Sequence, residues 1–342
     1  MKESEMNGYQ RIMEAMALQK PDRTPVAEFI IDKKVYRHFF PEAESQLDLE
    51  IAWGFDAVGC GVRFDPVETL DDGTFIDEWN VTYRRNAEEV AHPIKGNIQS
   101  IDDLRKYTPP DPFSPGRLGR LPELVEKYKG KKAIIFHQRA AFMWSCYLMG
   151  IDNMLMNFIL EPELCHDLLD MVLDVNLKIA RQAVRAGADI IVLGDDYAHN
   201  KGPLFSPADF RTFILPRLRK MVDTIHDEGA LVVKHSDGNI MKILDDIIDT
   251  GIDGLNPIEP VAGMDIGLIK EKYGNRISIW GNIDCGDLLC NGTTDQVRKA
   301  VEECISIAGK NGGHILTSSN SIHSSVNPEN YRTMIETAMN LK

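Results

Sequence analysis

Residues 187–196 read GADIIVLGDD, and this stretch decides the fold. Its apolar run, within Asp189–Gly194, predicts a short strand covered on both faces, as in a parallel sheet wrapped by helices. Gly187 comes directly after the amphipathic stretch Pro162–Arg185, where a glycine commonly ends a helix. Two aspartates follow the strand. The order helix, glycine, buried strand and polar end is typical of a βα unit.

The same order recurs along the chain. Amphipathic stretches between the runs predict helices at Pro207–Asp227, Ile240–Thr250 and Thr294–Ala308. Eight β-rich runs predict strands at Pro25–Ile31, Phe55–Gly59, Ala133–His137, Asp189–Gly194, Leu231–His235, Gly254–Pro257, Ile277–Trp280 and His314–Thr317.

Eight such units predict one α/β domain over residues 1–342, a (β/α)8 TIM barrel with a short helical N-terminal extension. A doubly wound sheet would need a glycine-rich phosphate loop after the first strand, but residues 32–40 read DKKVYRHFF. Residues 63–98, after the second strand, contain DDGTFIDEWNVTYRR. Its turn residues and alternation predict a β-hairpin insertion.

Charge and cysteine usage exclude several classes. Asp and Glu total 52 against 38 Lys and Arg, and this excess of 14 negative charges argues against nucleic acid or a membrane surface as a partner. The first residues lack an apolar signal segment, and the six cysteines form no metal or disulfide pattern, so we expect a cytoplasmic protein. The apolar stretch 140–160 contains Gly150 and Asp152, which favours two buried helices over a membrane span.

In a barrel of this kind the chemistry lies at the carboxyl ends of the strands. Each polar residue there also has a structural interpretation, because Ser206, Ser236 or Asp237 can simply cap a helix. The expected catalytic residues are Asp196, His235, Asp237 and Glu259. The expected substrate-binding residues are Glu28, His137, Tyr197, Asn282 and Asn320.

The pair His235 and Asp237 places an imidazole and a carboxylate on one side of an extended segment, which suits a divalent metal or a proton relay. Two ligands are too few for a metal site. Further ligands are expected among Glu259, Asp195 or Asp196, and His323. The alternative is that His235 is a partly buried histidine hydrogen-bonded to Asp196.

Several stretches carry a family resemblance that extends over roughly residues 8 to 340. They are RTPVAEF, DEWNVTYRR with a following HPI, ADIIVLGDDYAHNKGPLFSPADFRTFILPRLRKMVD, HSDGNI, GLNPIEP, ISIWGNID, NGTTDQV and GGHILTSSNSIHSSVNPENY. They resemble the uroporphyrinogen decarboxylase superfamily, which implies a (β/α)8 barrel. The superfamily contains decarboxylases and corrinoid-dependent methyltransferases.

Two of its branches fit the residues less well. The decarboxylases hold the carboxylates of a tetrapyrrole with an arginine-rich segment after the first strand, where this chain offers Arg37 and two lysines, Lys33 and Lys34. Methyltransferases that act on thiols hold zinc with a His-x-Cys pair and a distant cysteine. Here the pair is His235 and Asp237, and a soft thiolate ligand is missing from it.

The resemblance therefore implies the methyltransferase component of an O-demethylase, which moves a methyl group, from a phenyl methyl ether in our expectation, to the cobalt of a corrinoid protein. It also implies a metal motif of acid, acid and histidine, which Asp287, Glu302 and His323 match in spacing, although Asp287 stands where the motif has Glu. With His235 from the strand-end analysis, these are the expected zinc ligands. Glu302 lies beside barrel-facing Val301 on its predicted helix, a position that favours the solvent face.

A metal or an acid is needed because an alkoxide or phenoxide is a poor leaving group. A general acid supplies about 10²–10⁴-fold in rate, and a Lewis acid also stabilises the departing oxygen. The expected partners are a corrinoid protein, a small methylated substrate and, in a homodimer, a second copy of the chain. The alternatives are a tetrapyrrole decarboxylase, a methylcobamide:thiol methyltransferase and a corrinoid-binding protein without catalysis.

Overall fold

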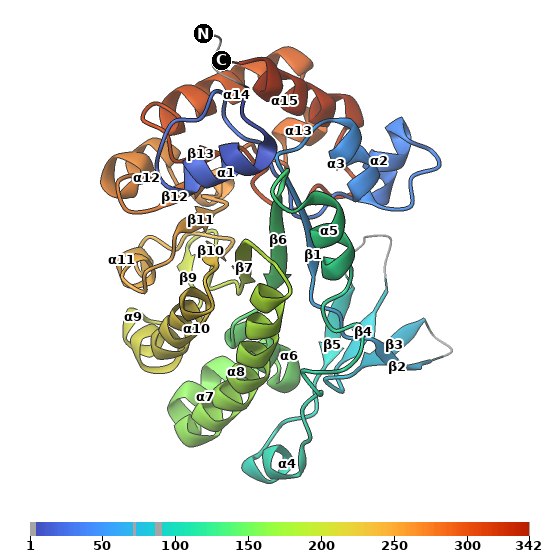
Figure 1. The fold of residues 1–342 in the computed structure, drawn as a ribbon. Coiled ribbons are helices and arrows are strands. Elements are labelled where there is room, and N and C mark those ends of the chain that lie inside the picture. Colours follow the sequence, from blue (N-terminus) through green and yellow to red (C-terminus); the bar gives the residue numbers. More distant parts are fainter. Residues whose placement is uncertain (1–4, 71–72, 86–90, 342) are drawn as a thin grey trace.

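The computed structural model describes residues 5–70, 73–85 and 91–341. Its centre is a parallel sheet in the order β1-β6-β7-β10-β11-β12-β13 (Figure 1). The sequence predicted strands at all seven positions. Their bounds are β1 Ala57–Gly61, β6 Ala133–Gln138, β7 Ile190–Gly194, β10 Leu231–His235, β11 Gly254–Asn256, β12 Ser278–Trp280 and β13 His314–Ile315.

The eighth predicted strand, Pro25–Ile31, is not one. It makes isolated parallel bridges, Val26 with Leu316 and Ile31 with Ile322, and the carbonyl of Val26 accepts the N–H of Asp56. It therefore lies between the edge strands β13 and β1. A ladder does not form because side chains take two of its N–H groups: that of Val26 donates to Asp56 and that of Ile31 to Gln46.

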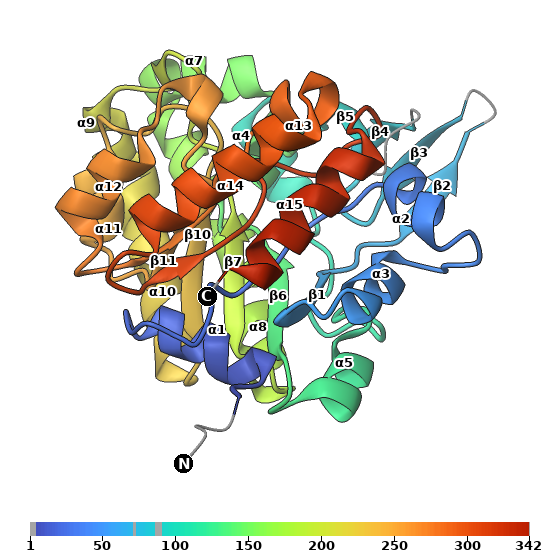
Figure 2. The ribbon, with the colours of Figure 1, turned by 90° about the horizontal axis from the view of Figure 1, so that it is seen from above.

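Helices pack around the outside of this sheet, with α5 against β6, α8 against β7 and α10 against β10 (Figure 1). Figure 2 shows α14 and α15 lying side by side. The helices are α1 Gly8–Met16, α2 Lys33–Phe39, α3 Gln46–Ala52, α4 Ile101–Lys106, α5 Leu121–Tyr128, α6 Phe142–Met149, α7 Ile151–Leu160, α8 Pro162–Arg185, α9 Pro207–Asp209, α10 Leu215–Asp227, α11 Leu244–Ile248, α12 Ile266–Tyr273, α13 Leu288–Asn291, α14 Thr294–Ala308 and α15 Pro328–Asn340.

The predicted bounds of α8 and α14 are confirmed. The helix predicted over Pro207–Asp227 is divided by a π-helical turn at Phe210–Ile214, next to Pro216 at the start of α10. The helix predicted over Ile240–Thr250 shortens to α11, and the adjoining glycine at 251 has a positive φ. No helix of the described residues is long and apolar enough to cross a membrane, and the stretch 140–160 forms α6 and α7.

The insertion after β1 contains a four-stranded antiparallel sheet rather than a single hairpin. Its strands are β2 Pro66–Thr69, β3 Thr74–Asp77, β4 Thr82–Arg84 and β5 His92–Lys95, paired in chain order. A two-stranded hairpin, β8 Ala198–His199 with β9 Gly202–Pro203, follows β7. Residues 71–72, the start of the quoted hairpin stretch, lie outside the described residues.

Asp56 attaches the N-terminal part of the chain to the sheet. Its side chain is 1% exposed and pairs with two arginines, Arg23 at 2.7 Å and Arg11 at 3.2 Å. It also accepts the N–H of Val26 at 2.8 Å. Since Val26 leads into Glu28 and Phe29, this buried ion pair holds one wall of the cavity described below.

We expect Asp56→Ala to lower the free energy of unfolding by about 3–5 kcal/mol, because it leaves the largely buried guanidinium of Arg23 without a carboxylate partner among the described residues. Urea unfolding followed by circular dichroism measures the change. Asp65→Ala is the matched control: Asp65 pairs with Arg63 on the surface at 2.6 Å, and an exposed pair contributes at most about 1 kcal/mol. Equal losses in the two variants would contradict the role given to Asp56.

Candidate active site

A cavity of about 600 Å³ opens at the carboxyl ends of β1, β6, β7, β10 and β11. This is the edge of the sheet at which the chemistry was expected. The polar residues that line it are Glu28, Gln46, His137, Gln138, Arg139, Asp196, His235, Asp237, Asn256, Ser318, Asn320 and Ser321. Its apolar and aromatic lining includes Phe29, Tyr83, Trp144 and Tyr147.

Asp196, His235 and Asp237 form the Asp196–His235–Asp237 group, whose nearest ligand atoms all lie within 4.8 Å of one another. His235 Nε2 is 3.7 Å from Asp196 Oδ1 and 3.5 Å from Asp237 Oδ1. The two aspartates are also connected, since the N–H of Asp237 donates to Asp196 Oδ1 at 3.2 Å. Adjacent parallel strands, β7 and β10, place these three side chains together.

Asn256 fixes the orientation of the His235 ring. The two residues are register partners on β10 and β11, and Asn256 Oδ1 lies 2.5 Å from His235 Nδ1. The amide nitrogen of Asn256 donates to Thr317 Oγ1 at 3.0 Å and to a main-chain carbonyl, so its oxygen must face the histidine. Nδ1 therefore carries a proton in the neutral ring, and the Nε2 lone pair faces the two carboxylates.

The carboxylates of the group are only partly satisfied. Asp237 Oδ2 accepts from the amide of Asn320 at 2.7 Å, whereas its Oδ1 is buried without a hydrogen-bond partner among the described residues. Burial raises the pKa of Asp237, and the nearby Asp196 adds to this, while His235 opposes it. A nitrogen lone pair and two carboxylates, one of which has an unsatisfied oxygen, are a donor set that fits a divalent cation.

Glu259 supports the group from outside. Its Oε2 accepts the N–H of Gly238 at 2.7 Å, directly after Asp237. Burial raises the pKa of Glu259, and this hydrogen bond opposes the shift. Glu259 does not line the cavity, so the structure gives it a positioning contact rather than contact with a ligand.

Glu28 and His137 line the cavity and both favour their neutral forms. Glu28 is 7% exposed, and burial raises its pKa to about 8 although the N–H of Ser318 donates to it at 3.1 Å. Burial and the proximity of His235 lower the pKa of His137 to about 4. Phe29 packs edge-on against His137 with the ring centroids 4.8 Å apart. This part of the cavity therefore carries little charge at neutral pH.

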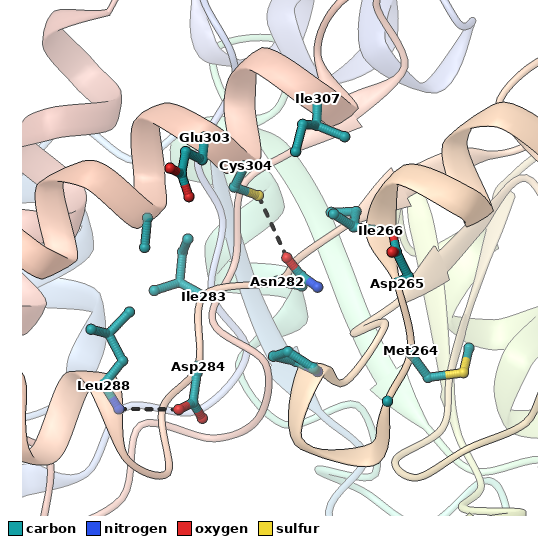
Figure 3. Close-up of a pocket in the computed structure, with 13 residues that line it drawn as sticks. Met264, Asp265, Ile266, Asn282, Ile283, Asp284, Leu288, Glu303, Cys304 and Ile307 are labelled. Atoms are coloured by element: carbon teal, nitrogen blue, oxygen red, sulfur yellow. Dashed lines mark hydrogen bonds between the residues drawn. The ribbon is translucent and has the colours of Figure 1, made fainter.

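Two of the expected substrate-binding residues lie elsewhere. Tyr197 is fully buried beneath the site, where the Lys234 ammonium lies 4.0 Å from its ring centroid. Asn282 lines a separate hollow of about 530 Å³ near α12 and α14. Figure 3 shows it beside Cys304, whose Sγ lies 3.6 Å from Asn282 Oδ1. Neither residue contacts the main cavity.

The structure does not bring Asp287, Glu302 and His323 together. Asp287 accepts from the amide of Asn291 at 2.9 Å at the start of α13. Glu302 is exposed on α14, on the solvent face that its helical position favoured. His323 Nε2 is 3.2 Å from the carbonyl of Cys285 and 3.9 Å from Cys290 Sγ. Within the described ranges, the Asp196–His235–Asp237 group is the one set of three such ligands that gathers.

Sequence reasoning missed Lys234 and Asn256, which hold the site from below. Lys234 is fully buried, and its ammonium donates to the carbonyls of Asp195 and His235. Asn256 lies one residue before the end of the predicted strand Gly254–Pro257, and this position near a strand end was the signal that could have found it. Asp195, a possible ligand by sequence, instead accepts backbone N–H groups from Ala141, Phe142 and Met143 at the start of α6.

Comparison with known proteins places residues 81–341 in the family model described as uroporphyrinogen decarboxylase (URO-D). A methylcobamide:CoM methyltransferase MtbA of Methanosarcina acetivorans is 26% identical, with 97% of this chain and 98% of that protein aligned. A methylated-thiol–coenzyme M methyltransferase of Methanosarcina mazei is 30% identical over 55% of this chain, and the chain spans only about half, 49%, of that relative. Uroporphyrinogen decarboxylases are also among the relatives.

A solved methyltransferase from Methanosarcina mazei shares the fold. It superposes with a TM-score of 0.77 at 19% identity and covers 98% of this chain and 99% of its own. The parallel sheet with its surrounding helices is therefore the fold of that methyltransferase.

We expect Glu28→Gln to remove one source of pH dependence from stability. In the unfolded chain Glu28 ionises near pH 4.5, whereas in the fold it holds its proton up to about pH 8. The wild type should therefore lose stability as pH rises between these values, by about 1.4 kcal/mol per pH unit from this group. The variant lacks that slope, so the difference in unfolding free energy between variant and wild type should grow in favour of the variant.

Urea unfolding at pH 5, 6, 7 and 8 measures this difference. A constant difference in unfolding free energy between Glu28→Gln and wild type is also expected, because the substituted amide accepts fewer hydrogen bonds than the carboxyl group. This offset does not change how the unfolding free energy varies with pH. Glu42→Gln, at an exposed position, is the control. Parallel pH profiles for Glu28→Gln and wild type would show that Glu28 is ionised in the fold.

Proposed function

Since the chain belongs to the uroporphyrinogen decarboxylase family, we propose that it is a corrinoid-dependent methyltransferase. It takes a methyl group from a methyl ether, with a phenyl methyl ether as the preferred donor, and transfers it to the cobalt of a separate corrinoid protein. The observation that carries this proposal is the Asp196–His235–Asp237 group at the base of an aromatic-walled cavity. One relative that aligns over nearly its whole length is named a methylcobamide:CoM methyltransferase, and this name supports a corrinoid partner.

The reaction balances as a displacement at the methyl carbon. The cobalt(I) electron pair forms the new Co–C bond, and the C–O bond electrons leave with the ether oxygen, so the products are methylcobalt(III) and an alcohol or phenol. The departing oxygen needs a proton or a positive charge. When no metal is bound, Asp237, whose pKa is raised by burial, supplies the proton, and the amide of Asn320 holds its carboxyl in place.

The same group fits zinc, with His235 Nε2 and the carboxylates of Asp196 and Asp237 as ligands. When bound there, zinc would act as a Lewis acid toward the ether oxygen. Asn256 would then orient the ligating ring from its far nitrogen, as outer partners of metal-bound histidines do.

The cavity does not favour a tetrapyrrole substrate. Several substrate carboxylates would need several fixed cations, but among the described residues that line the cavity Arg139 is the one arginine and no lysine is present. Transfer to a thiol is the second candidate, because two relatives are named as coenzyme M methyltransferases. No cysteine belongs to the Asp196–His235–Asp237 group.

We expect purified protein to bind close to one equivalent of zinc through His235. His235→Ala should abolish binding, and Asn256→Ala should weaken it about 10–100-fold because the ring loses its orienting partner. Competition against a chromogenic chelator measures the affinity. His226→Ala, which removes a histidine paired with Asp253 away from the cavity, is the matched control.

His323→Ala tests the other proposed ligand set and should leave zinc binding unchanged. Zinc content that is retained in His235→Ala and lost in His323→Ala would reverse this assignment. It would locate the metal at the motif that the structure does not assemble.

We expect the loss of the acid to depend on the leaving group. With Asp237→Asn, ethers of weakly acidic phenols should lose about 10²–10⁴-fold in rate, whereas ethers of acidic phenols should lose little. The assay follows the disappearance of cobalt(I) absorbance when a reduced corrinoid carrier, the protein and ring-substituted methyl ethers are mixed. Asp65→Asn, an exposed carboxylate of the insertion, is the control.

A structural defect would slow all donors by the same factor. Equal losses across the series would therefore remove Asp237 from the role of acid. No cobalt(I) consumption with any ether, together with consumption of methylcobalt by a thiol, would replace the proposed function by the second candidate.

A further inference from the structure

Helix α7 exposes three large apolar side chains to solvent along one ridge of its surface. Ile159 is 81% exposed, Leu160 68% and Met156 52%. Residues three and four positions apart are neighbours on a helix, so the three side chains form one group, which we call the α7 surface. Single exposed apolar residues are common on proteins, whereas a continuous group marks a surface that another molecule covers.

The exposure of the α7 surface does not come from a loosely attached helix. On its other face α7 buries Met154 and Phe158. The ring of Phe158 stacks on that of Phe213, with the ring centroids 4.2 Å apart and the planes 8° from parallel. This packing fixes which side of α7 faces solvent. The exposure of Ile159 and Leu160 is therefore a property of the fold.

Helix α6 connects the α7 surface to the candidate active site. Trp144 and Tyr147 of α6 line the cavity, and backbone N–H groups at the start of α6 donate to Asp195. α6 and α7 pack against each other and are joined at Gly150. Figure 1 shows both helices toward the end of the parallel sheet where the insertion strands β2 to β5 lie, which is the end at which the cavity opens.

A protein that brings a corrinoid to this cavity also covers α7. A standard interface takes about 800 Å² of each protein, which corresponds to a circle of about 16 Å radius. Packed helices have their axes about 8–10 Å apart, and α6, which packs against α7, already forms part of the cavity wall. A partner centred on the mouth of the cavity therefore reaches the α7 surface.

The charges around the α7 surface determine the chemistry of its partner. Residues 140–177 contain six acidic residues and no lysine or arginine. Asp152, Glu161 and Glu163 are exposed, and within the described ranges none of them pairs with a cation within 4.0 Å. In a twofold dimer the same surface of a second copy would place acid against acid, which is unfavourable. An apolar surface bordered by lysines or arginines is complementary to it.

We propose that the α7 surface is a docking surface for the corrinoid protein, and that the contact area of that protein has an apolar centre bordered by lysines or arginines. This inference rests on the proposed methyltransferase function. Ile159 and Leu160 lie at the apolar centre of the contact, and the acidic residues around them face the basic border. Burial of the apolar side chains slows dissociation, and the complementary charges accelerate association.

Binding between the two proteins, without any methyl donor, tests the proposal. The probe is the corrinoid protein used as methyl acceptor in the cobalt(I) assay, immobilised for surface plasmon resonance. Ile159→Ser and Leu160→Ser should each raise the Kd about 10–100-fold, mainly through faster dissociation. Both side chains are exposed, so these substitutions change stability little. Ile307→Ser, which replaces an exposed isoleucine in the last turn of α14, is the matched control and should leave the Kd unchanged.

The salt dependence of association tests the basic border. Association of wild type should slow as NaCl is raised, because salt screens the attraction between complementary charges. The double variant Glu161→Gln with Glu163→Gln should associate about 3–10-fold more slowly at low salt and respond less to added salt. Glu271→Gln, at an exposed position near the end of α12, is the control for the loss of one negative charge. Association that is independent of salt would overturn the basic border.

An unchanged Kd in folded Ile159→Ser and Leu160→Ser would overturn the docking surface, and methyl transfer that continues in these variants would leave the proposed function in place. Binding that depends on the α7 surface but is not followed by methyl transfer to cobalt would contradict the proposed function and keep the docking surface. Sedimentation velocity tests the other occupant. A wild-type dimer that the two substitutions dissociate would overturn the proposal and assign the α7 surface to a second copy of the chain.

Discussion

The buried ammonium of Lys234 is the interaction on which the site depends. It is fully enclosed and donates to main-chain carbonyls of Leu193 at 3.4 Å and Asp195 at 2.5 Å, as well as to that of His235. These carbonyls come from the ends of β7 and β10, where regular strand pairing stops. Burial lowers the pKa of Lys234 to about 8, and Asp195 opposes this shift, so the lysine is still largely charged at neutral pH. One cation thus joins the two strand ends that carry Asp196, His235 and Asp237.

Above Lys234, hydrogen bonds determine how the side chains of the cavity are oriented and which of their atoms are free to react. Thr317 and a carbonyl orient Asn256, Asn256 orients His235, and the free nitrogen of His235 is then directed at two carboxylates. Along the opposite wall, Glu28 and His137 favour their neutral forms because burial penalises their charge. The charge in the cavity is therefore concentrated at the Asp196–His235–Asp237 group and at Arg139.

The insertion and the N-terminal segment complete the cavity, and they are the parts in which sequence patterns were least informative. Residues 25–31 have the composition of a strand, yet side chains of Asp56 and Gln46 take N–H groups that a ladder would need. Alternation in the insertion indicated antiparallel strands, but four strands form the sheet. Its edge strands β2 and β5 lie outside the quoted stretch and pair with β3 and β4. Tyr83 of this sheet reaches the cavity beside Tyr147.

The sequence by itself determined the alternation of strands and helices and the polar residues at the strand ends, because periodicity and strand-end composition are local properties of the chain. It thereby identified Asp196, His235 and Asp237 as candidates. Only the tertiary structure decided which candidates meet. Asp287, Glu302 and His323 match a spacing but do not gather as ligands, and Tyr197 is buried beneath the site. It also decided that Asp195 caps a helix and that Arg139 has no carboxylate partner among the described residues. The physical reason is that ion pairs, burial and caps join residues far apart in the chain, and spacing along a sequence carries no information about which of them come into contact.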